Sequence, residues 1–294
     1  MNNFLFIINP FSGRGQKEKT EIKIASCCRR QHVECTVMHT EAPGHAAVLA
    51  KQHAGKFDAI IAVGGDGTVN EVARALVHTR TPMGIIPNGS GNGLARHLGI
   101  PMKTTEAIKT LFNSVPTLID TFRINGNLGV NVAGIGFDGH IANRFGNHAQ
   151  RGLSGYTQLV IADYFSYPEF SYQFTYEGEH HHGNGFIVSI ANSSQFGNNA
   201  FIAPAASVTD GMLDFVSVRK IPIWRLPTAI ARLFTRKLSA ASYYSVQRLT
   251  DFNITCEEDI SFHIDGESCS KAKEFSIQTD AASLLVLRPR NKTI

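Results

Sequence analysis

Short apolar runs alternate with helix-like segments over roughly the first 125 residues of the chain. The runs are rich in Ile, Val and Phe, as in buried strands, and the segments between them have apolar residues at helical spacing. The strand-like runs are 4–8, 33–37, 59–63 and 83–86, and the helix-like segments are 17–31, 45–53 and 69–77. This rhythm predicts a parallel sheet covered by helices, in which ligands bind at the loops that follow the strands.

The pattern changes after the hairpin-type turn INGN at 124–127. Short strand-like segments separated by turn residues then predominate, interrupted by two helix-like segments at 153–166 and 223–238. The strand-like segments are 128–135, 170–176, 186–191, 213–218, 252–255, 260–264 and 275–278. We therefore expect a first domain at 1–127 and an antiparallel second domain at 128–282. The last apolar run, 284–287, fits either sheet, and we expect 283–294 to complete the first domain.

Composition narrows the class of protein only moderately. Of the 294 residues, 43% are hydrophobic and 18% charged, which is the balance of a globular protein. The net charge of +4 suits a polyanionic ligand or an anionic membrane surface, but it is too small to predict nucleic-acid binding. The start of the sequence does not resemble a signal peptide, no apolar run is long enough to span a membrane, and the five cysteines form no CxxC pair. These features predict a cytoplasmic protein with reduced thiols.

The strand-like run 59–63 leads into the glycine-rich sequence GGDGT at 64–68. Glycines let backbone N–H groups approach a phosphate, and the dipole of the helix that follows favours an anion. The loop matches neither the Walker A pattern nor GxGxxG. A carboxylate facing phosphates needs a cation or a transferable proton, so Asp66 suggests Mg²⁺ handling or proton abstraction. The alternative is an Asp-Gly turn in which Asp66 caps the helix.

Two further glycine-bearing loops also follow strand-like apolar runs: NPFSGRG at 9–15, with Arg14, and PNGSGNGLAR at 87–96. Because the carboxyl ends of parallel strands meet at one edge of a sheet, the three loops are expected to cluster. Together they predict a nucleotide site.

These motifs form part of an ordered series that resembles the diacylglycerol-kinase catalytic-domain family, the bacterial lipid kinases that are similar to sphingosine and ceramide kinases. The series is NPFSG, GGDGTVNEV, PNGSGNGLAR, GIGFDG, APAASVTDGMLD and IDGE, running from Asn9 to Glu267. The resemblance implies a three-layer α/β nucleotide domain of the NAD-kinase type, a C-terminal β-sandwich and an active site in the cleft between them. The GGDGT element alone is shared with NAD kinases, but the late DGMLD and DGE elements favour the lipid kinases.

The resemblance also implies which residues bind ATP and Mg²⁺. Matching ATP positions are Asn9, Pro10, Ser12, Gly13, Thr40, Gly64, Gly65, Asp66, Gly67, Thr68, Asn70 and Ser90. Mg²⁺ is expected at Asp210, with Ser207 and Met212 contributing, and whether this site is structural or catalytic stays open. Read without the family, TDG at 209–211 is an ordinary hairpin turn.

For the chemical step, the resemblance implies that Glu267 accepts the proton of the lipid hydroxyl and that Asp265 supports it. Asp66 is the second candidate base, as in the sphingosine-kinase branch. Read without the family, Asp265-Gly266-Glu267 is a solvated acidic turn. Asp138, in GIGFDG, is either a polar contact for the lipid or a helix cap.

The chain departs from the bacterial pattern GTxND, because Gly93 stands where the acidic residue is expected. Since GSGN is closer to the sphingosine and ceramide kinases, both a diacylglycerol-like and a sphingoid substrate stay open. The segment IPIWRLPTAIARLFTRK at 221–237 mixes apolar and basic residues. It is either an interfacial membrane-docking segment or an amphipathic helix packed on its own domain.

The sequence therefore predicts an ATP-dependent lipid kinase that uses Mg²⁺ and meets its lipid substrate at a membrane surface without spanning the membrane. A homodimer and the choice between ATP and GTP are left open. The alternatives are an NAD kinase-like phosphotransferase and a non-catalytic nucleotide-binding regulator.

Overall fold

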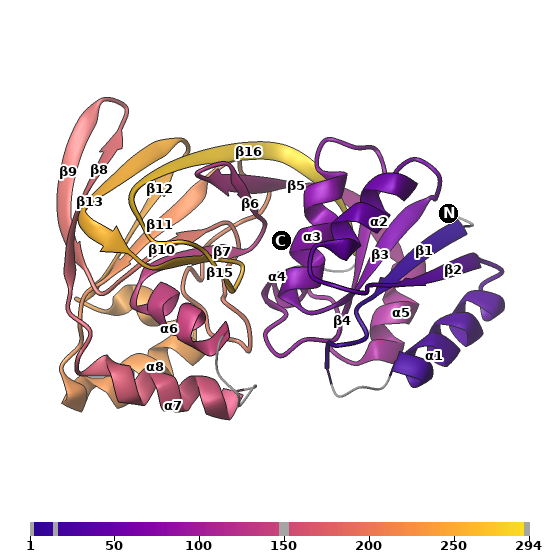
Figure 1. Ribbon diagram of the computed structural model, residues 1–294, viewed down its shortest axis with the longest axis horizontal. Coiled ribbons are helices and arrows are strands. Elements are labelled where there is room, and N and C mark those ends of the chain that lie inside the picture. The colour runs from indigo at the N-terminus through magenta and orange to yellow at the C-terminus, as the bar shows by residue number, and fades with distance from the viewer. Residues whose placement is uncertain (1–2, 14–16, 147–152, 291–294) are drawn as a thin grey trace. The chain divides into compact units, whose positions relative to one another are not determined.

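A computed structural model of the chain describes residues 3–13, 17–146 and 153–290 (Figure 1). Arg14, one of the residues singled out in the first loop, lies outside these ranges. The chain forms two compact units, one of Met1–Asp120 with Ala281–Ile294 and the other of Thr121–Asp280. Strand β5 (Ser114–Ile124) and the 18-residue strand β16 (Ala272–Pro289) contribute to both units.

The first unit is built on a parallel sheet in the order β2-β1-β3-β4-β16. Helices α1 and α5 pack together on one face of this sheet and α2 and α3 on the other (Figure 1). The remaining elements are β1 (Asn3–Ile8), α1 (Lys17–Arg30), β2 (Glu34–His39), α2 (His45–His53), β3 (Ala59–Gly64), α3 (Asp66–Leu76), β4 (Met83–Pro87), α4 (Gly93–His97) and α5 (Thr104–Phe112). Since every residue of β3 and β4 is buried, the continuous apolar runs of the sequence are explained by cover on both faces.

The order of these strands creates a switch point. From β1 the chain crosses to β2 on one side, and it returns to β3 on the other side. The loops after β1 and β3 therefore leave the sheet next to each other in opposite directions. Such a point is where open α/β sheets bind their ligands.

The second unit is a β-sandwich. One antiparallel sheet has the order β12-β11-β10-β7-β14-β15, and the facing strands run β16-β13-β8-β9. Its elements are β6 (Asn127–Gly129), β7 (Val132–Gly136), α6 (Phe137–Gly146), α7 (Leu153–Tyr164), β8 (Phe170–Tyr176), β9 (Glu179–Gly185), β10 (Ile187–Ala191), β11 (Leu213–Val218), η1 (Ile223–Arg225), α8 (Leu226–Phe234), η2 (Leu238–Ala240), β12 (Tyr244–Leu249), β13 (Phe252–Ile260), β14 (Phe262–Ile264) and β15 (Glu267–Ser268).

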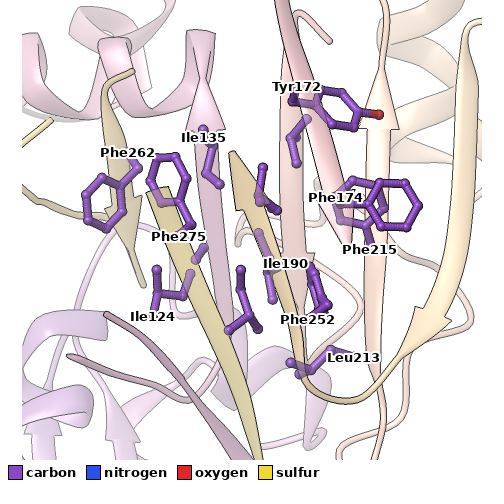
Figure 2. Close-up of a cluster of buried hydrophobic side chains, with 14 of the residues drawn as sticks. Ile124, Ile135, Tyr172, Phe174, Ile190, Leu213, Phe215, Phe252, Phe262 and Phe275 are labelled. Carbon is purple, nitrogen blue, oxygen red and sulfur yellow. The ribbon is translucent and has the colours of Figure 1, made fainter. Parts of the chain in front are cut away.

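Aromatic side chains from both sheets fill the core of the sandwich (Figure 2). Phe262 of one sheet meets Phe275 of the other edge to face at 5.2 Å, and Phe215 meets Phe252 in the same way at 5.6 Å. All four rings are nearly or fully buried. Edge-to-face pairs of this kind add to the free energy gained by burying apolar area.

The structure differs from the sequence prediction in several elements, and strands β5, β9 and β12 were not predicted. The predicted strand 128–135 is two strands, β6 and β7, because the backbone between them bonds to the Asp265 side chain. The predicted helix 223–238 is divided into η1, α8 and η2. Within the described residues, none of the helices combines the length and the apolar character needed to cross a membrane.

Candidate active site

Three loops of the first unit meet at the switch point. Asn9, after β1, donates from Nδ2 to the Thr68 hydroxyl of α3 at 3.1 Å. Asn88, after β4, donates from its backbone N–H to the Gly64 carbonyl at 2.7 Å and from Nδ2 to the Ser12 hydroxyl at 3.2 Å. The three motifs that the sequence singled out therefore lie together and are linked by hydrogen bonds.

Several glycines are required because the loops pack against each other. A Cβ on Gly89 would lie 2.5 Å from the Gly65 Cα, and a Cβ on Gly64 would lie 2.4 Å from the Thr68 hydroxyl oxygen. Gly13 has a left-handed backbone, and its Cβ would lie 2.6 Å from Oδ1 of Asn88. These residues keep the first turn of α3 close to two neighbouring loops.

The N-terminus of α3 suits an anion. Its N-cap is Gly65, which makes no side-chain capping hydrogen bond, and the helix continues for 11 residues. Main-chain donors and the positive end of the helix dipole therefore face the loop cluster without a competing cap from the N-cap side chain. A phosphate group fits this donor set.

Asp66 uses both carboxylate oxygens within the loop cluster. Its Oδ2 accepts the backbone N–H of Asn92 and its Oδ1 accepts that of Gly93, each at 2.8 Å. The side chain thus caps the short helix α4 from a different loop. An acidic residue at position 93 would place a second negative charge beside this carboxylate, and Gly93 avoids that repulsion.

The other predicted ATP positions of this unit lie around the same loops. Thr40 follows β2, is buried, and donates its backbone N–H to the Ile8 carbonyl at 3.0 Å. Asn70 is buried in α3 and accepts a hydrogen bond from Arg74 at 2.8 Å. Ser90 is exposed in the loop after β4.

Glu71 was not predicted from the sequence as a residue of this region. Its carboxylate accepts the backbone N–H groups of Gly44 at 2.8 Å and Ala46 at 2.9 Å, so it caps α2 from α3. The missing side-chain cap at the start of α2, where Gly44 precedes the helix, was the available signal.

In the second unit, Asp265 and Gly266 form the two-residue turn between β14 and β15. Both residues have positive φ, 52° and 86°, which is the backbone of a type I′ hairpin. The buried Asp265 carboxylate accepts the backbone N–H groups of Val130 at 2.9 Å, Asn131 at 2.8 Å and Val132 at 3.1 Å. Asp265 therefore fixes both the turn and the segment that precedes β7.

Glu267 follows this turn as the first residue of β15 and is exposed. It pairs with Ile264 across the hairpin. A carboxylate exposed on a rigid hairpin can meet an external hydroxyl group without first reorganising the backbone.

Asp138 is buried at the start of α6, with 6% of its surface exposed. Its Oδ2 lies 3.5 Å from Nε2 of the buried His263, and a Cβ on Gly134 would lie 1.9 Å from that same oxygen. His263 in turn accepts the backbone N–H of Gly266 on Nδ1 at 3.2 Å. His263, which was not predicted from the sequence, thus connects Asp138 to the Asp265-Gly266 turn.

The predicted Mg²⁺ positions share one loop before β11. Asp210 accepts the Met212 N–H at 3.1 Å, and the Ser207 hydroxyl lies 3.2 Å from that of Thr209. Arg248 lies 3.7 Å from Asp210 and 3.5 Å from Asp214. Burial raises the pKa of Asp214 to about 6, although Arg248 opposes this shift.

The oxygen donors of this loop are of the type that Mg²⁺ prefers. No group of three His, Cys, Asp or Glu side chains suitable for a metal occurs in the part of the chain that the structure describes. Asp210 supplies a carboxylate in this loop and Ser207 a hydroxyl group, and Arg248 already lies beside that carboxylate.

A three-layer α/β unit with a cluster of glycine-rich loops is followed in the chain by a β-sandwich. Residues 3–124 match the diacylglycerol kinase catalytic domain, and residues 131–286 match the YegS C-terminal NAD kinase beta sandwich-like domain. The chain belongs to the diacylglycerol-kinase family of lipid kinases. The resemblance inferred from the motifs and the predicted fold class are both confirmed.

Relatives cover most of the chain. A diacylglycerol kinase of Bacillus subtilis (strain 168) is 31% identical over 232 residues, 75% of each chain. A diacylglycerol kinase of Mycobacterium tuberculosis (strain ATCC 25618 / H37Rv) is 26% identical over 295 residues, 97% of this chain and 94% of the relative.

Solved structures support the fold. A crystal structure from Bacillus anthracis str. Sterne superimposes with a TM-score of 0.83 at 23% identity, covering 98% of this chain and 96% of its own. Another crystal structure from the same organism, described as a diacylglycerol kinase, has a TM-score of 0.77 at 24% identity. The match covers 98% of this chain and 97% of the other. At these identities the likeness establishes the fold alone.

Proposed function

We propose that this chain is an ATP-dependent lipid kinase that transfers the γ-phosphoryl group to a hydroxyl of a diacylglycerol-like or sphingoid lipid. The observation that carries the proposal is the meeting of three glycine-rich loops at the switch point of the parallel sheet. The family of the chain supports the same conclusion. We also infer that the protein works in the cytoplasm and associates with the membrane peripherally.

For the nucleotide, the proposal assigns the phosphates to the N-terminus of α3 and to the loops after β1 and β4. Asp66 serves there as a positioning residue, because its carboxylate holds the α4 loop against the turn that precedes α3. The proposal assigns Mg²⁺ to Asp210 in the loop before β11, either as a structural or as a catalytic ion. This sheet edge then orients the γ-phosphoryl group, which is the main task of a phosphotransferase.

For the acceptor, the proposal assigns the base to Glu267. As the lipid oxygen forms its bond to the γ-phosphorus, the hydroxyl proton passes to the Glu267 carboxylate, and the bond from the γ-phosphorus to the β–γ bridging oxygen breaks to release ADP. Asp265 positions Glu267 by fixing the turn before it. Asp138 remains a candidate lipid contact, although its burial beside His263 favours a positioning role for it too.

The proposal is tested by incubating the purified chain with Mg²⁺ and radiolabelled ATP. Diacylglycerol, monoacylglycerol, phosphatidylglycerol, ceramide, sphingoid bases and NAD are offered separately. Labelling of one lipid class supports the proposal and identifies the acceptor. Labelling of NAD alone supports the NAD kinase-like alternative, and ATP binding without transfer to any acceptor supports the regulatory one.

Replacing Gly89 with alanine is expected to weaken ATP binding by at least about tenfold, because the new Cβ would lie 2.5 Å from the Gly65 Cα, a backbone atom that cannot rotate out of the way. Calorimetric titration with Mg²⁺-ATP measures this effect. Gly126→Ala is a control, since a Cβ there meets no atom within 4 Å and only the positive φ is strained. Equal ATP affinity for Gly89→Ala and wild type would contradict the packing described for these loops.

A further inference from the structure

Helix α8 has more apolar surface than its own unit covers. Leu226 packs against the cluster around Phe137, and Leu233 packs against the cluster around Val218. Ala229, between them in the helical period, is buried with 6% of its surface exposed. These residues form the face that attaches α8 to the sandwich unit, so the packing interpretation of the sequence holds for this face.

A second apolar stripe runs along the same segment. Ile230 and Phe234, four residues apart on α8, are 54% and 47% exposed. In η1, Ile223 and Trp224 are 52% and 75% exposed. A helix needs one apolar face for packing, and a contiguous exposed set of large apolar residues marks an interaction surface. Folding of the unit does not account for these four side chains.

The end of α7 adjoins this segment. The Ile221 N–H donates to the Tyr164 hydroxyl at 3.0 Å, and Lys220 donates from Nζ to the Phe165 carbonyl at 3.1 Å. Phe165 itself is 63% exposed. We call Phe165, Ile223, Trp224, Ile230 and Phe234 the η1–α8 patch.

Basic residues are concentrated in the segment that contains most of the patch. Residues 219–237 contain six of the 28 Lys and Arg of the chain and none of its 24 acidic residues, so elsewhere acidic side chains outnumber basic ones. The positive net charge of the protein therefore originates in this segment. The six are Arg219, Lys220, Arg225, Arg232, Arg236 and Lys237.

Some of these basic side chains line surface hollows. One hollow of about 460 Å³ is lined by Arg219, Lys220 and Arg225, together with Glu169. An adjoining hollow of about 400 Å³ is lined by Arg225 and Arg232. Glu169 lies 3.8 Å from Arg219 and offsets part of the positive charge of the first hollow. Hollows of this composition suit anionic headgroups.

We propose that the η1–α8 patch docks the protein on an anionic lipid bilayer. Trp224 and its apolar neighbours enter the boundary between headgroups and acyl chains, and the basic residues contact lipid phosphates. The mixture of Trp, Phe and Ile with Arg and Lys is the composition of interfacial helices. A second copy of the chain fits less well, because pairing two such surfaces would bring twelve basic side chains together. The docking proposal rests on the proposed lipid-kinase function in one respect only: a lipid substrate is what would bring the protein to a bilayer.

Trp224 is the single tryptophan of the chain, so intrinsic fluorescence reports on the patch directly. The protein is titrated with phosphatidylcholine vesicles that contain or lack phosphatidylglycerol, and with the same vesicles carrying brominated acyl chains. Anionic vesicles should shift the emission to the blue, and the brominated lipid should quench it. The double variant Arg225→Glu/Lys237→Glu should bind anionic vesicles at least about tenfold more weakly, because each basic residue near the surface contributes about 1 kcal/mol.

Phe234→Ser tests the apolar contribution while retaining Trp224, and it should also weaken vesicle binding. Ile22→Ser is the matched control, because Ile22 is 69% exposed on α1 in the other unit and should leave binding unchanged. The proposal is overturned if the chain binds anionic vesicles, as measured by flotation, while Trp224 emission stays constant. It is also overturned if Trp224 emission shifts to the blue in the absence of vesicles and the shift grows with the fraction of protein that has the mass of a dimer. A wild-type chain that inserts Trp224 but labels no lipid would contradict the proposed function and leave the docking surface intact.

Discussion

Glu267→Gln is expected to lower kcat for lipid phosphorylation by roughly 10²–10⁴-fold, the usual contribution of a general base. Glutamine keeps the size of the side chain but cannot accept the proton of the hydroxyl. Because Glu267 is exposed on a hairpin that is fixed by Asp265, the variant should fold normally. KM for ATP should change little, since the loops proposed to bind the nucleotide belong to the other unit. Steady-state transfer of radiolabel to the preferred lipid measures both quantities.

Two variants make this result specific. Glu258→Gln removes another exposed glutamate of the same unit and should keep full kcat. Asp66→Asn should mainly raise KM for ATP, because asparagine can accept only one of the two N–H groups now bound by Asp66. If Asp66→Asn abolishes kcat at unchanged KM while Glu267→Gln is active, the base is Asp66.

Asp265→Ala is expected to reduce the free energy of unfolding by about 3 kcal/mol, with loss of activity. The substitution leaves the N–H groups of Val130, Asn131 and Val132 without their acceptor, and unsatisfied buried donors are costly. Alanine is also strained at a φ of 52°. Urea denaturation followed by circular dichroism measures the change.

Asp265→Asn separates the two causes. Asparagine tolerates the left-handed backbone but has only one acceptor oxygen, so the loss of stability should be intermediate. Asp259→Ala, at an exposed site on β13, should cost little. Unchanged stability of Asp265→Ala would show that the three hydrogen bonds do not stabilise the unit.

The sequence predicted the features that depend on local pattern. The apolar runs that became β1, β3 and β4 are buried, and the loops after them carry the expected glycines. Chain order alone also placed these loops at one edge of a parallel sheet. The role of helix α8 was harder to predict, because a helix with two apolar faces is compatible both with packing on its own domain and with docking on a membrane.

Features that depend on distant partners were not predictable. The strand β9 has the polar sequence EHHHGNG and is held by pairing with β8, in which His181 stacks on Phe174. The Asp265 carboxylate accepts hydrogen bonds from a segment more than 130 residues away, so the local sequence around Asp265 contains no signal for this contact. His263 was missed for the same reason, since Asp138 belongs to another element, whereas Glu71 was missed although the start of α2 without a side-chain cap offered a signal.

The route of β16 has a consequence for biosynthesis. This strand carries the chain out of the sandwich and into the parallel sheet, where Val286 pairs with Met83 of β4. The sheet that begins with the earliest residues is therefore completed by residues that the ribosome adds only after the whole sandwich unit. During translation β4 remains an open edge until β16 emerges, and an open edge is prone to pair with other chains. The first unit should consequently depend most on protection by chaperones while the sandwich is being made.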